Sequence, residues 1–421
     1  MKQLLFIAHR IPFPPNKGER VRAFHEIKAL SKYFRVTVAA LAHNHEDVEA
    51  ANELKNFCQD VLIVSVSNTA KLLRAGFYQL IGKSATEGYF FSRRFRKMII
   101  SEARHRQFDM VMCYSSSMMP YGLEIPAIAR IIDLVDVDSA KWSSYAHSSR
   151  WPLSWLYQRE SSAVHRIETS AVAKYDAVLL VSQDEVDALG LSDGKVKVIA
   201  NGVDVDFFQP DIVAPIDMES PNLVFTGTMD YRPNVEGVCW FVGNVWPELK
   251  RREPNLTFTI VGRNPVKAVR QLSQVPGVTV TGFVPDVRPY LAAASIVIAP
   301  LRIARGIQNK ILEAMAMGKA VVASPAALEG LEIQRGSDVL QADTPDEWCE
   351  HTTHLLSNES LRTQLGRTAR QTVERKYRWS VQMQPLVSLC RRLVQDTPTL
   401  VGNSEAFQNA GIIPEGDKAL R

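Results

Sequence analysis

The sequence predicts an α/β protein with two doubly wound, Rossmann-like domains that face each other across a cleft. The chain has 421 residues, which is too long for one ordinary hydrophobic core. Short apolar runs alternate with helical patterns, as in parallel sheets that are covered by helices on both faces. The alternation stops at a polar stretch over 201–220 and then starts again. We therefore expect two sheets joined by a linker.

The first domain is predicted to span residues 1–200. Its strands are expected at 3–8, 36–41, 61–66, 110–114, 130–135, 177–181 and 195–200. Its helices are expected at 19–32, 46–57, 69–81, 93–106 and 153–174. Because the strands and helices alternate, the connections are crossovers and the sheet is parallel.

The second domain is predicted to span residues 221–377, after the linker at 201–220. Its strands are expected at 223–226, 256–261, 278–281, 296–300 and 320–324. Its helices are expected at 234–251, 266–274, 287–293, 309–317, 345–356 and 359–376. Residues 378–395 are expected to contribute a last helix, at 381–394, that packs back on the first domain. The tail at 396–421 has little apolar pattern and several Gly and Pro, so we expect it to be disordered.

Composition narrows the class of protein. Hydrophobic content of 46% and charged content of 22% are typical of a globular chain, and a net charge of +4 is too small to indicate a nucleic-acid partner. The five cysteines are scattered and form no Cys-x-x-Cys pair, which argues against a disulfide framework or a zinc site and for a reducing compartment. Residues 1–9 are too short an apolar run for a signal peptide, and no run reaches transmembrane length. We expect a cytoplasmic protein.

The stretch 305–318 carries the strongest functional signal. It lies between two buried strand patterns, at the carboxyl end of a strand, where doubly wound sheets bind ligands. Gly306 allows a close backbone approach, and a helix that opens near Asn309 presents free N–H groups to an anion. Lys310 adds a cation, and Glu313 adds a carboxylate for sugar hydroxyls. The pattern therefore indicates a nucleotide-sugar site. The alternative is that Glu313 only stabilises the helix dipole and Gly306 only forms a turn.

Two loops of the first domain are also expected at the ligand edge of its sheet. A Pro-rich loop leads to Gly18, which opens a helix with several cations. The strand at 130–135 runs into three acids, Asp133, Asp136 and Asp138. A buried Asp133 would need a partner, Asp138 could cap the next helix, and Asp136 is the best candidate for contact with an acceptor. A purely structural role is an open alternative for each acid.

Two basic helices suggest a further partner. The stretches 69–81 and 93–106 combine Lys and Arg with apolar residues, as do helices that lie on an anionic membrane surface. The alternative is an ordinary solvated helix over a core stripe.

Several motifs, taken together, resemble a known family. They are Asn201-Gly202-Val203-Asp204, Phe225-Thr226-Gly227-Thr228-Met229, Ile260-Val261-Gly262, Val280-Thr281-Gly282-Phe283-Val284-Pro285-Asp286 and Lys310-Ile311-Leu312-Glu313-Ala314-Met315-Ala316-Met317-Gly318. Their order is similar to that of glycosyltransferase family 4, of the two-domain GT-B fold. With the stretches 8–20 and 227–234, the chain most resembles the sugar transferases of the PEP-CTERM/exosortase system. The resemblance covers about residues 1 to 395.

The resemblance implies roles for individual residues. Glu313 matches the carboxylate that holds the nucleotide ribose, whereas Arg305 stands where the family has another Glu. Residues that match donor-binding positions, or that stand in through their backbone, are Gly18, Gly227, Val284, Gly306, Ile307, Gln308, Asn309 and Lys310. We assign the catalytic contacts to Asp136, Lys310 and Arg232. The two cations are expected to stabilise the departing diphosphate without a metal.

The resemblance further implies a retaining, metal-independent hexosyltransferase of exopolysaccharide biosynthesis, with a nucleotide sugar as donor and no cofactor. The acceptor would be a lipid-linked or growing oligosaccharide, and the protein would be peripheral at the inner face of the cytoplasmic membrane. A sugar-nucleotide epimerase and a binding protein with weakened catalysis are the alternatives. A nicotinamide-dependent enzyme is disfavoured because no Gly-x-Gly-x-x-Gly follows a strand.

Overall fold

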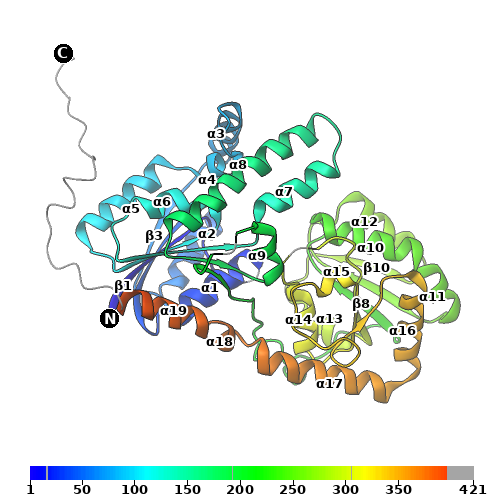
Figure 1. The fold of residues 1–421 in the computed structure, drawn as a ribbon. Helices are drawn as coiled ribbons and strands as arrows, with labels where there is room; N and C mark the ends of the chain where they lie inside the picture. The colour runs from blue at the N-terminus through cyan, green and yellow to red at the C-terminus, as the bar shows by residue number, and fades with distance from the viewer. Residues whose placement is uncertain (16–17, 192, 305, 396–421) are drawn as a thin grey trace, which may run out of the picture.

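The structure is a computed structural model that describes residues 1–15, 18–191, 193–304 and 306–395. Two sheets lie side by side, each with helices around it (Figure 1). The N-terminal sheet has the strand order β3-β2-β1-β4-β5-β6-β7 and the C-terminal sheet has the order β10-β9-β8-β11-β12-β13. All pairings between these strands are parallel. The predicted fold class is confirmed, whereas the predicted disorder of 396–421 falls outside the described residues.

The N-terminal domain is built on a sheet that is buried on both faces. Its strands are β1 (Lys2–Ala8), β2 (Phe34–Ala42), β3 (Asp60–Ser65), β4 (Met110–Tyr114), β5 (Ala129–Val135), β6 (Ala177–Leu180) and β7 (Val196–Val198). Alternate residues of β1 enter separate clusters on the two faces, with Leu4 and Phe6 in one and Leu5 and Ile7 in the other. This double burial explains why the strands are continuous apolar runs in the sequence.

The helices of this domain include several that the sequence did not predict. They are α1 (Gly18–Leu30), α2 (His45–Leu54), α3 (Asn68–Leu80), α4 (Ala85–Phe90), α5 (Arg93–His105), α6 (Met119–Leu123), α7 (Asp138–His147), α8 (Leu153–Lys174) and α9 (Gln183–Leu189). The unpredicted α4, α6 and α9 have five to seven residues, too few for a clear helical period. The N-cap of α7 is Val137, and Asp138 is the first residue of the helix, so the alternative role of Asp138 as a helix cap is wrong.

The C-terminal domain repeats the architecture on a smaller sheet. Its strands are β8 (Asn222–Thr226), β9 (Thr257–Val261), β10 (Val278–Gly282), β11 (Ile296–Ala299), β12 (Val321–Ala323) and β13 (Leu340–Gln341). Its helices are α10 (Arg232–Asn244), α11 (Trp246–Arg252), α12 (Lys267–Gln271), α13 (Arg288–Ala293), α14 (Asn309–Ala316), α15 (Pro325–Leu328), α16 (Pro345–Ser357) and α17 (Glu359–Lys376). The single helix expected at 234–251 is divided into α10 and α11, because Pro247 cannot continue a helix.

The chain crosses between the domains twice, and the two crossings touch. Val203 in the linker donates its N–H to the carbonyl of Tyr377, 2.7 Å away, just before α18 (Trp379–Gln382) and α19 (Gln384–Gln395). A Cβ on Gly202 would lie 2.8 Å from the same carbonyl oxygen, so this glycine permits the contact. The apolar side chains of α18 and α19 then join the core of the N-terminal domain.

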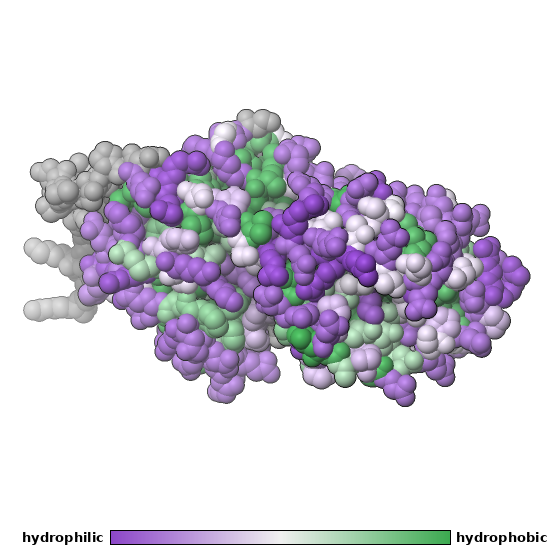
Figure 2. Space-filling view, turned by 90° about the horizontal axis from the view of Figure 1, so that it is seen from below, coloured by the Kyte–Doolittle hydropathy of each residue, from purple (hydrophilic) through white to green (hydrophobic). Residues whose placement is uncertain are grey.

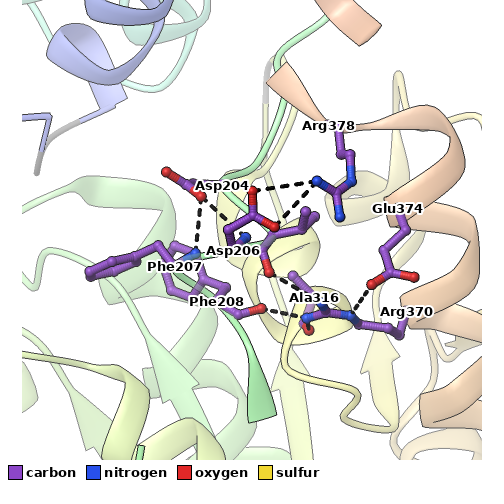
Figure 3. A network of polar contacts seen from close by, with 9 residues as sticks. Asp204, Asp206, Phe207, Phe208, Ala316, Arg370, Glu374 and Arg378 are labelled. Atoms are coloured by element: carbon purple, nitrogen blue, oxygen red, sulfur yellow. Dashed lines mark hydrogen bonds and ion pairs between the residues drawn. The ribbon is translucent and has the colours of Figure 1, made fainter. Parts of the chain in front are cut away.

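Arg370 of α17 holds the linker against the C-terminal domain (Figure 3). Its guanidinium donates to the carbonyls of Phe208 at 2.6 Å and Val205 at 3.1 Å, and to that of Ala316 at the end of α14. Its Nε pairs with Glu374 at 2.8 Å. One cation therefore satisfies three carbonyl groups, two in the linker and one at the end of α14.

We expect Arg370→Met to lower the free energy of unfolding by about 2–3 kcal/mol, because three carbonyls lose a charged donor. Thermal and urea unfolding measure this loss. The matched control is Arg367→Met, an exposed cation on the same helix, which we expect to change little. Equal losses for the two variants would contradict the role assigned to Arg370.

The face shown in Figure 2 is mostly hydrophilic, with hydrophobic residues in small patches between the polar ones. No helix in the described part of the chain is both long and apolar enough to cross a bilayer.

Candidate active site

The loop between β11 and α14 leads directly into a helix N-terminus. Gly306 has φ +63°, a left-handed conformation that favours glycine. The side chain of Gln308 donates to the carbonyl of Gly306 at 3.2 Å, and α14 begins at Asn309. Gly318, with φ +64°, follows the end of the helix, as the sequence predicts. The backbone thus presents the free N–H groups of α14 at the carboxyl edge of the sheet.

Lys310 lies in the first turn of α14 and contacts the first turn of α10. Its Nζ is 2.5 Å from Oδ1 of Asn234 and 4.6 Å from the centre of the Phe225 ring. Burial lowers the pKa of Lys310 to about 7, because a charged ammonium is poorly solvated there. A bound diphosphate would favour the charged form, so this lysine is suited to respond to an anionic ligand.

Glu313 lies three residues further along the same helix. Burial raises its pKa to about 7, although the charge of Lys310 acts in the opposite direction. Near neutral pH the site therefore contains a partly protonated carboxyl group and a partly deprotonated amine. Ribose hydroxyls could donate to the carboxylate form of Glu313, and phosphate oxygens could accept from the ammonium form of Lys310.

The loop after β8 packs against Asn234 and the loop after β9. A Cβ on Gly227 would lie 2.6 Å from the side-chain nitrogen of Asn234, which donates to the carbonyl of Thr228 at 2.9 Å. A Cβ on Gly262 would collide with the carbonyl oxygen of Gly227. These contacts bring Gly227, Asn234 and Lys310 together, and they leave no room for side chains at the two glycines.

Asp136 follows β5 through a strained turn. Its N–H donates to the carbonyl of Leu134 at 2.9 Å, across Val135 with φ +69°. This three-residue turn is unfavourable for a β-branched residue, and Asp133 stabilises it by accepting the N–H of Val135 at 2.8 Å. Burial, with the nearby charges of Glu185 and Asp138, raises the pKa of Asp136 to about 7. Strain of this kind is typical of functional sites.

The two sheet edges meet at Asp136 and Gly306. A Cβ on Gly306 would collide with Oδ1 of Asp136, so the glycine lets the two domains approach at this point. Beside the contact lies a cavity of about 280 Å³, lined by Ser182, Asp184 and Glu185 of one domain and by Arg302, Gly306 and Glu329 of the other, among other residues. This volume lies just below the roughly 300–1,000 Å³ of common ligand pockets, so in this arrangement it would hold only part of a nucleotide sugar.

A buried network connects the N-terminal core to α14. Arg22 pairs with Asp133 at 2.6 Å, as a buried acid requires, and also donates to Asn201 in the linker at 3.1 Å. Asn201 in turn donates to Asn309 at 3.4 Å. Arg20 pairs with Asp47 at 2.8 Å. Arg20 and Arg22 of α1 therefore have internal partners.

Other predicted site residues have different surroundings. Arg232 begins α10, pairs with Glu236 at 2.6 Å and donates to Ser148 of the N-terminal domain at 2.6 Å. Ile307 is buried in the C-terminal core, and Val284 packs against that core after β10. Gly18 begins α1. Arg305, where the family motif has a Glu, lies outside the described residues.

Sequence reasoning missed Asn234 and Glu185. Asn234 is the direct partner of Lys310, and Glu185 accepts the N–H of Val137 at 2.6 Å next to Asp136. A signal existed for Glu185, because it follows β6 at the same carboxyl edge as Asp136. For Asn234, which lies in the first turn of α10, only the tertiary structure reveals the contact with Lys310.

The match to a known protein family is confined to the C-terminal domain. Residues 220–358 match the family model described as "Glycosyl transferases group 1". The C-terminal domain is a group 1 glycosyltransferase domain. The match contains Gly227, Arg232, Val284 and the stretch from Gly306 to Glu313, whereas Asp136 and Gly18 lie outside it. In the group 1 domain, the predicted donor residues thus follow β8, β10 and β11 at one edge of the sheet.

Most of the chain, including both domains, resembles solved GT-B structures. Sucrose-phosphate synthase from Thermosynechococcus elongatus has a TM-score of 0.69 and 14% identity, over 94% of this chain and 100% of that one. The Anabaena protein HepE, in complex with UDP and glucose, has a TM-score of 0.65 and 14% identity, over 93% and 100%. WaaG, described as a glycosyltransferase involved in lipopolysaccharide biosynthesis, has a TM-score of 0.63 and 14% identity, over 92% and 99%. The fold is therefore GT-B.

One curated relative aligns along almost the whole chain. It is described as an uncharacterized 44.6 kDa protein in the cps region of Klebsiella pneumoniae. It is 18% identical over 389 residues, which are 90% of this chain and 97% of that protein.

Proposed function

We propose that the protein is a retaining glycosyltransferase of the hexosyltransferase type, which moves a sugar from a nucleotide-sugar donor to an acceptor hydroxyl. The observation that carries this proposal is the cluster of Lys310, Asn234 and Gly227 at the N-terminus of α14, opposite Asp136. The cluster offers a diphosphate a cation and backbone N–H groups, and Glu313 offers a carboxylate to the ribose. The complexes of HepE with UDP and with UDP-glucose support a donor of this class.

The reaction breaks the bond between the anomeric carbon and the diphosphate and forms one to the acceptor oxygen. Lys310 and the N–H groups of α14 stabilise the negative charge that develops on the leaving diphosphate, so a metal ion is not needed. Asp136 binds the acceptor hydroxyl, and its carboxylate, with a pKa near 7, accepts the proton that this hydroxyl loses as its oxygen bonds to the anomeric carbon. Arg232 contributes positive charge if it releases Glu236 when the donor binds.

The acceptor is proposed to be a lipid-linked or growing oligosaccharide in exopolysaccharide biosynthesis. The relative in the cps region and the likeness to WaaG support this class of acceptor. The motif order described above supports membership of glycosyltransferase family 4 and the finer assignment to the PEP-CTERM/exosortase system.

Nucleotide sugars test the proposal directly. A panel of them should raise the melting temperature of the protein when they bind the folded state, and the best donor should yield free nucleoside diphosphate only with an acceptor. An epimerised sugar nucleotide formed without acceptor would identify an epimerase instead. Binding with no turnover over a broad acceptor panel would identify a binding protein.

Glu313→Ala should weaken nucleotide binding by about 1.5–3 kcal/mol, the range for hydrogen bonds to charged groups. Titration calorimetry with the nucleoside diphosphate measures the loss. The melting temperature of the free protein should change little. Burial disfavours the ionised form of Glu313, so the carboxylate does not stabilise the fold and its removal costs little. Normal nucleotide affinity in this variant would remove Glu313 from the site.

A further inference from the structure

Large hydrophobic side chains are exposed together on α3 and at the start of α8. Nine of them define what we call the α3–α8 face: Leu72, Leu73, Phe77, Leu80, Ile81, Trp151, Leu153, Trp155 and Leu156. Leu73, Leu80 and Trp151 are 76%, 82% and 81% exposed. These segments are at the top of Figure 1, away from the face that Figure 2 shows. Clusters of this kind on a folded protein mark interaction surfaces.

The two parts of the face are joined by direct contacts. Arg159 of α8 donates to the carbonyl of Gln79 in α3 at 2.9 Å, and its guanidinium lies 4.8 Å from the centre of the Trp155 ring. The side chain of Gln79 donates to Glu160 at 2.6 Å. Because α3 and the start of α8 are held together, their exposed side chains form one surface.

The charged residues within the two segments that carry the face are all basic, and the acids that directly follow these segments are withdrawn from solvent, Glu160 being buried and Glu87 partly buried. Residues 61–86 and 139–159 contain no Asp or Glu, but they contain Lys71, Arg74, Lys83, Lys141, Arg150 and Arg159. Lys83 and Arg150 are exposed, whereas Lys71 is buried against His43. The partner of this surface is therefore expected to be both apolar and anionic.

We propose that the α3–α8 face docks on an anionic lipid bilayer. Its leucines and phenylalanine would enter the boundary between headgroups and acyl chains, and Trp151 and Trp155 would lie at headgroup level, where tryptophan is favoured. Lys83, Arg150 and Arg159 would contact lipid phosphates. A second copy of the chain would meet the same cations on its own face, so charge complementarity favours the bilayer.

The position of the face relates it to the candidate active site. Asp136 lies two residues before α7, and the ten residues of α7 (Asp138–His147) span about 15 Å before the turn that carries Trp151. Ser148 in this turn contacts Arg232 across the cleft. Docking would place the cleft close to the membrane surface. Only this last step rests on the proposed function; the docking itself does not.

The second basic helix, α5, differs from α3 because its apolar side is buried. The apolar side chains Phe95 and Ile99 of α5 are buried in the N-terminal core, so α5 is an ordinary surface helix, and none of its large hydrophobic side chains is exposed. Arg93, Arg94 and Lys97 are exposed but lack exposed hydrophobic neighbours on their helix. They provide a charge control for the α3–α8 face.

Vesicle sedimentation tests the proposal with the full chain and without nucleotide sugar. The wild type should pellet at low salt with vesicles of phosphatidylglycerol and phosphatidylcholine, and far less with phosphatidylcholine alone. The triple variant Leu73→Gln, Leu80→Gln, Trp151→Gln should bind at least tenfold more weakly. Its fold should be intact because these side chains are exposed, and its melting temperature and nucleotide affinity verify this.

Two control variants distinguish binding through the α3–α8 face from a general effect of surface charge or exposed hydrophobic residues. Ile212→Gln changes an exposed residue of the linker, and the triple variant Arg93→Gln, Arg94→Gln, Lys97→Gln removes three cations from α5. Both should bind anionic vesicles more tightly than the variant of the α3–α8 face. The proposal is overturned if the α5 variant loses as much binding, if the wild type ignores anionic vesicles, or if the face variant loses only self-association in gel filtration. Failure of the transferase assay would leave this readout unaffected.

Discussion

Lys310→Met lowers kcat/KM for the nucleotide sugar by about 100- to 1,000-fold, the loss expected when one preorganised donor to a developing anion is removed. Methionine keeps much of the apolar length of the lysine side chain, so the change removes mainly the charge and its contact with the Phe225 ring. Nucleoside diphosphate binding should fall much more than nucleoside binding, because only the diphosphate meets the ammonium. Steady-state kinetics and calorimetry with the two ligands measure the difference.

The same variant should change the pH dependence of binding. Since burial lowers the pKa of Lys310 to about 7, affinity for the diphosphate should fall above pH 7, where the free protein loses the ammonium. Since burial raises the pKa of Glu313 to about 7, affinity should also fall below pH 7, where the carboxylate is protonated. The wild type should therefore give a bell-shaped profile. Lys310→Met should lose the alkaline limb, while the acid limb moves to higher pH because the lysine no longer lowers the pKa of Glu313.

Lys267→Met is the matched control, since Lys267 is an exposed lysine in the same domain. It should leave both the kinetics and the pH profile unchanged. Activity of the wild type should persist in excess chelator. If Lys310→Met weakens nucleoside and diphosphate binding equally, the phosphate role of Lys310 is wrong.

Gly306→Ala is expected to lower kcat by about 100-fold, because a misplacement of about 1 Å at a reacting centre costs this much. The new Cβ would collide with Oδ1 of Asp136, so either the carboxyl group moves or the domains stay further apart. The alanine would also occupy a left-handed conformation, which costs roughly 1–2 kcal/mol. Single-turnover kinetics would show the loss in the transfer step.

Gly190→Ala is the control that measures the cost of placing alanine in a left-handed conformation without any new steric contact. Gly190 has φ +72° and no atom within 4 Å of a built Cβ, so this control should lose stability but keep its activity. The double variant Asp136→Ala, Gly306→Ala provides a second check, because it removes the carboxyl group with which the new Cβ collides. Nucleotide binding that depends on the close approach of the two domains should be restored. Sugar transfer should not be restored, because Asp136 is absent. If Gly306→Ala turns over normally while Gly190→Ala shows the expected strain, the contact with Asp136 is not needed for catalysis.

Local patterns in the sequence were sufficient to predict the fold class and the part of the site that is formed by the loop before α14 and by α14 itself. Strands buried on both faces must be continuous apolar runs, so β1, β2, β4 and β5 are visible without the structure. Gly306, Asn309 and Gly318 follow the local rules for a left-handed turn, a helix start and a helix end, and the structure places all three accordingly. Lys310 and Glu313 share a helix turn by their spacing alone.

Contacts between distant segments could be known only from the tertiary structure. Asp136 meets Gly306, and Lys310 meets Asn234, because the carboxyl edges of different strands are brought together, which no local pattern encodes. The pKa values near 7 follow from burial, and the inward positions of Arg20 and Arg22 follow from partners on other elements. An amphipathic pattern predicts a helix but not what covers its apolar side: α5 buries that side in the core, whereas α3 leaves it exposed. The sequence thus determined which segments form strands and helices and which residues stand at their ends, and long-range packing decided which of those residues meet and which surface remains open.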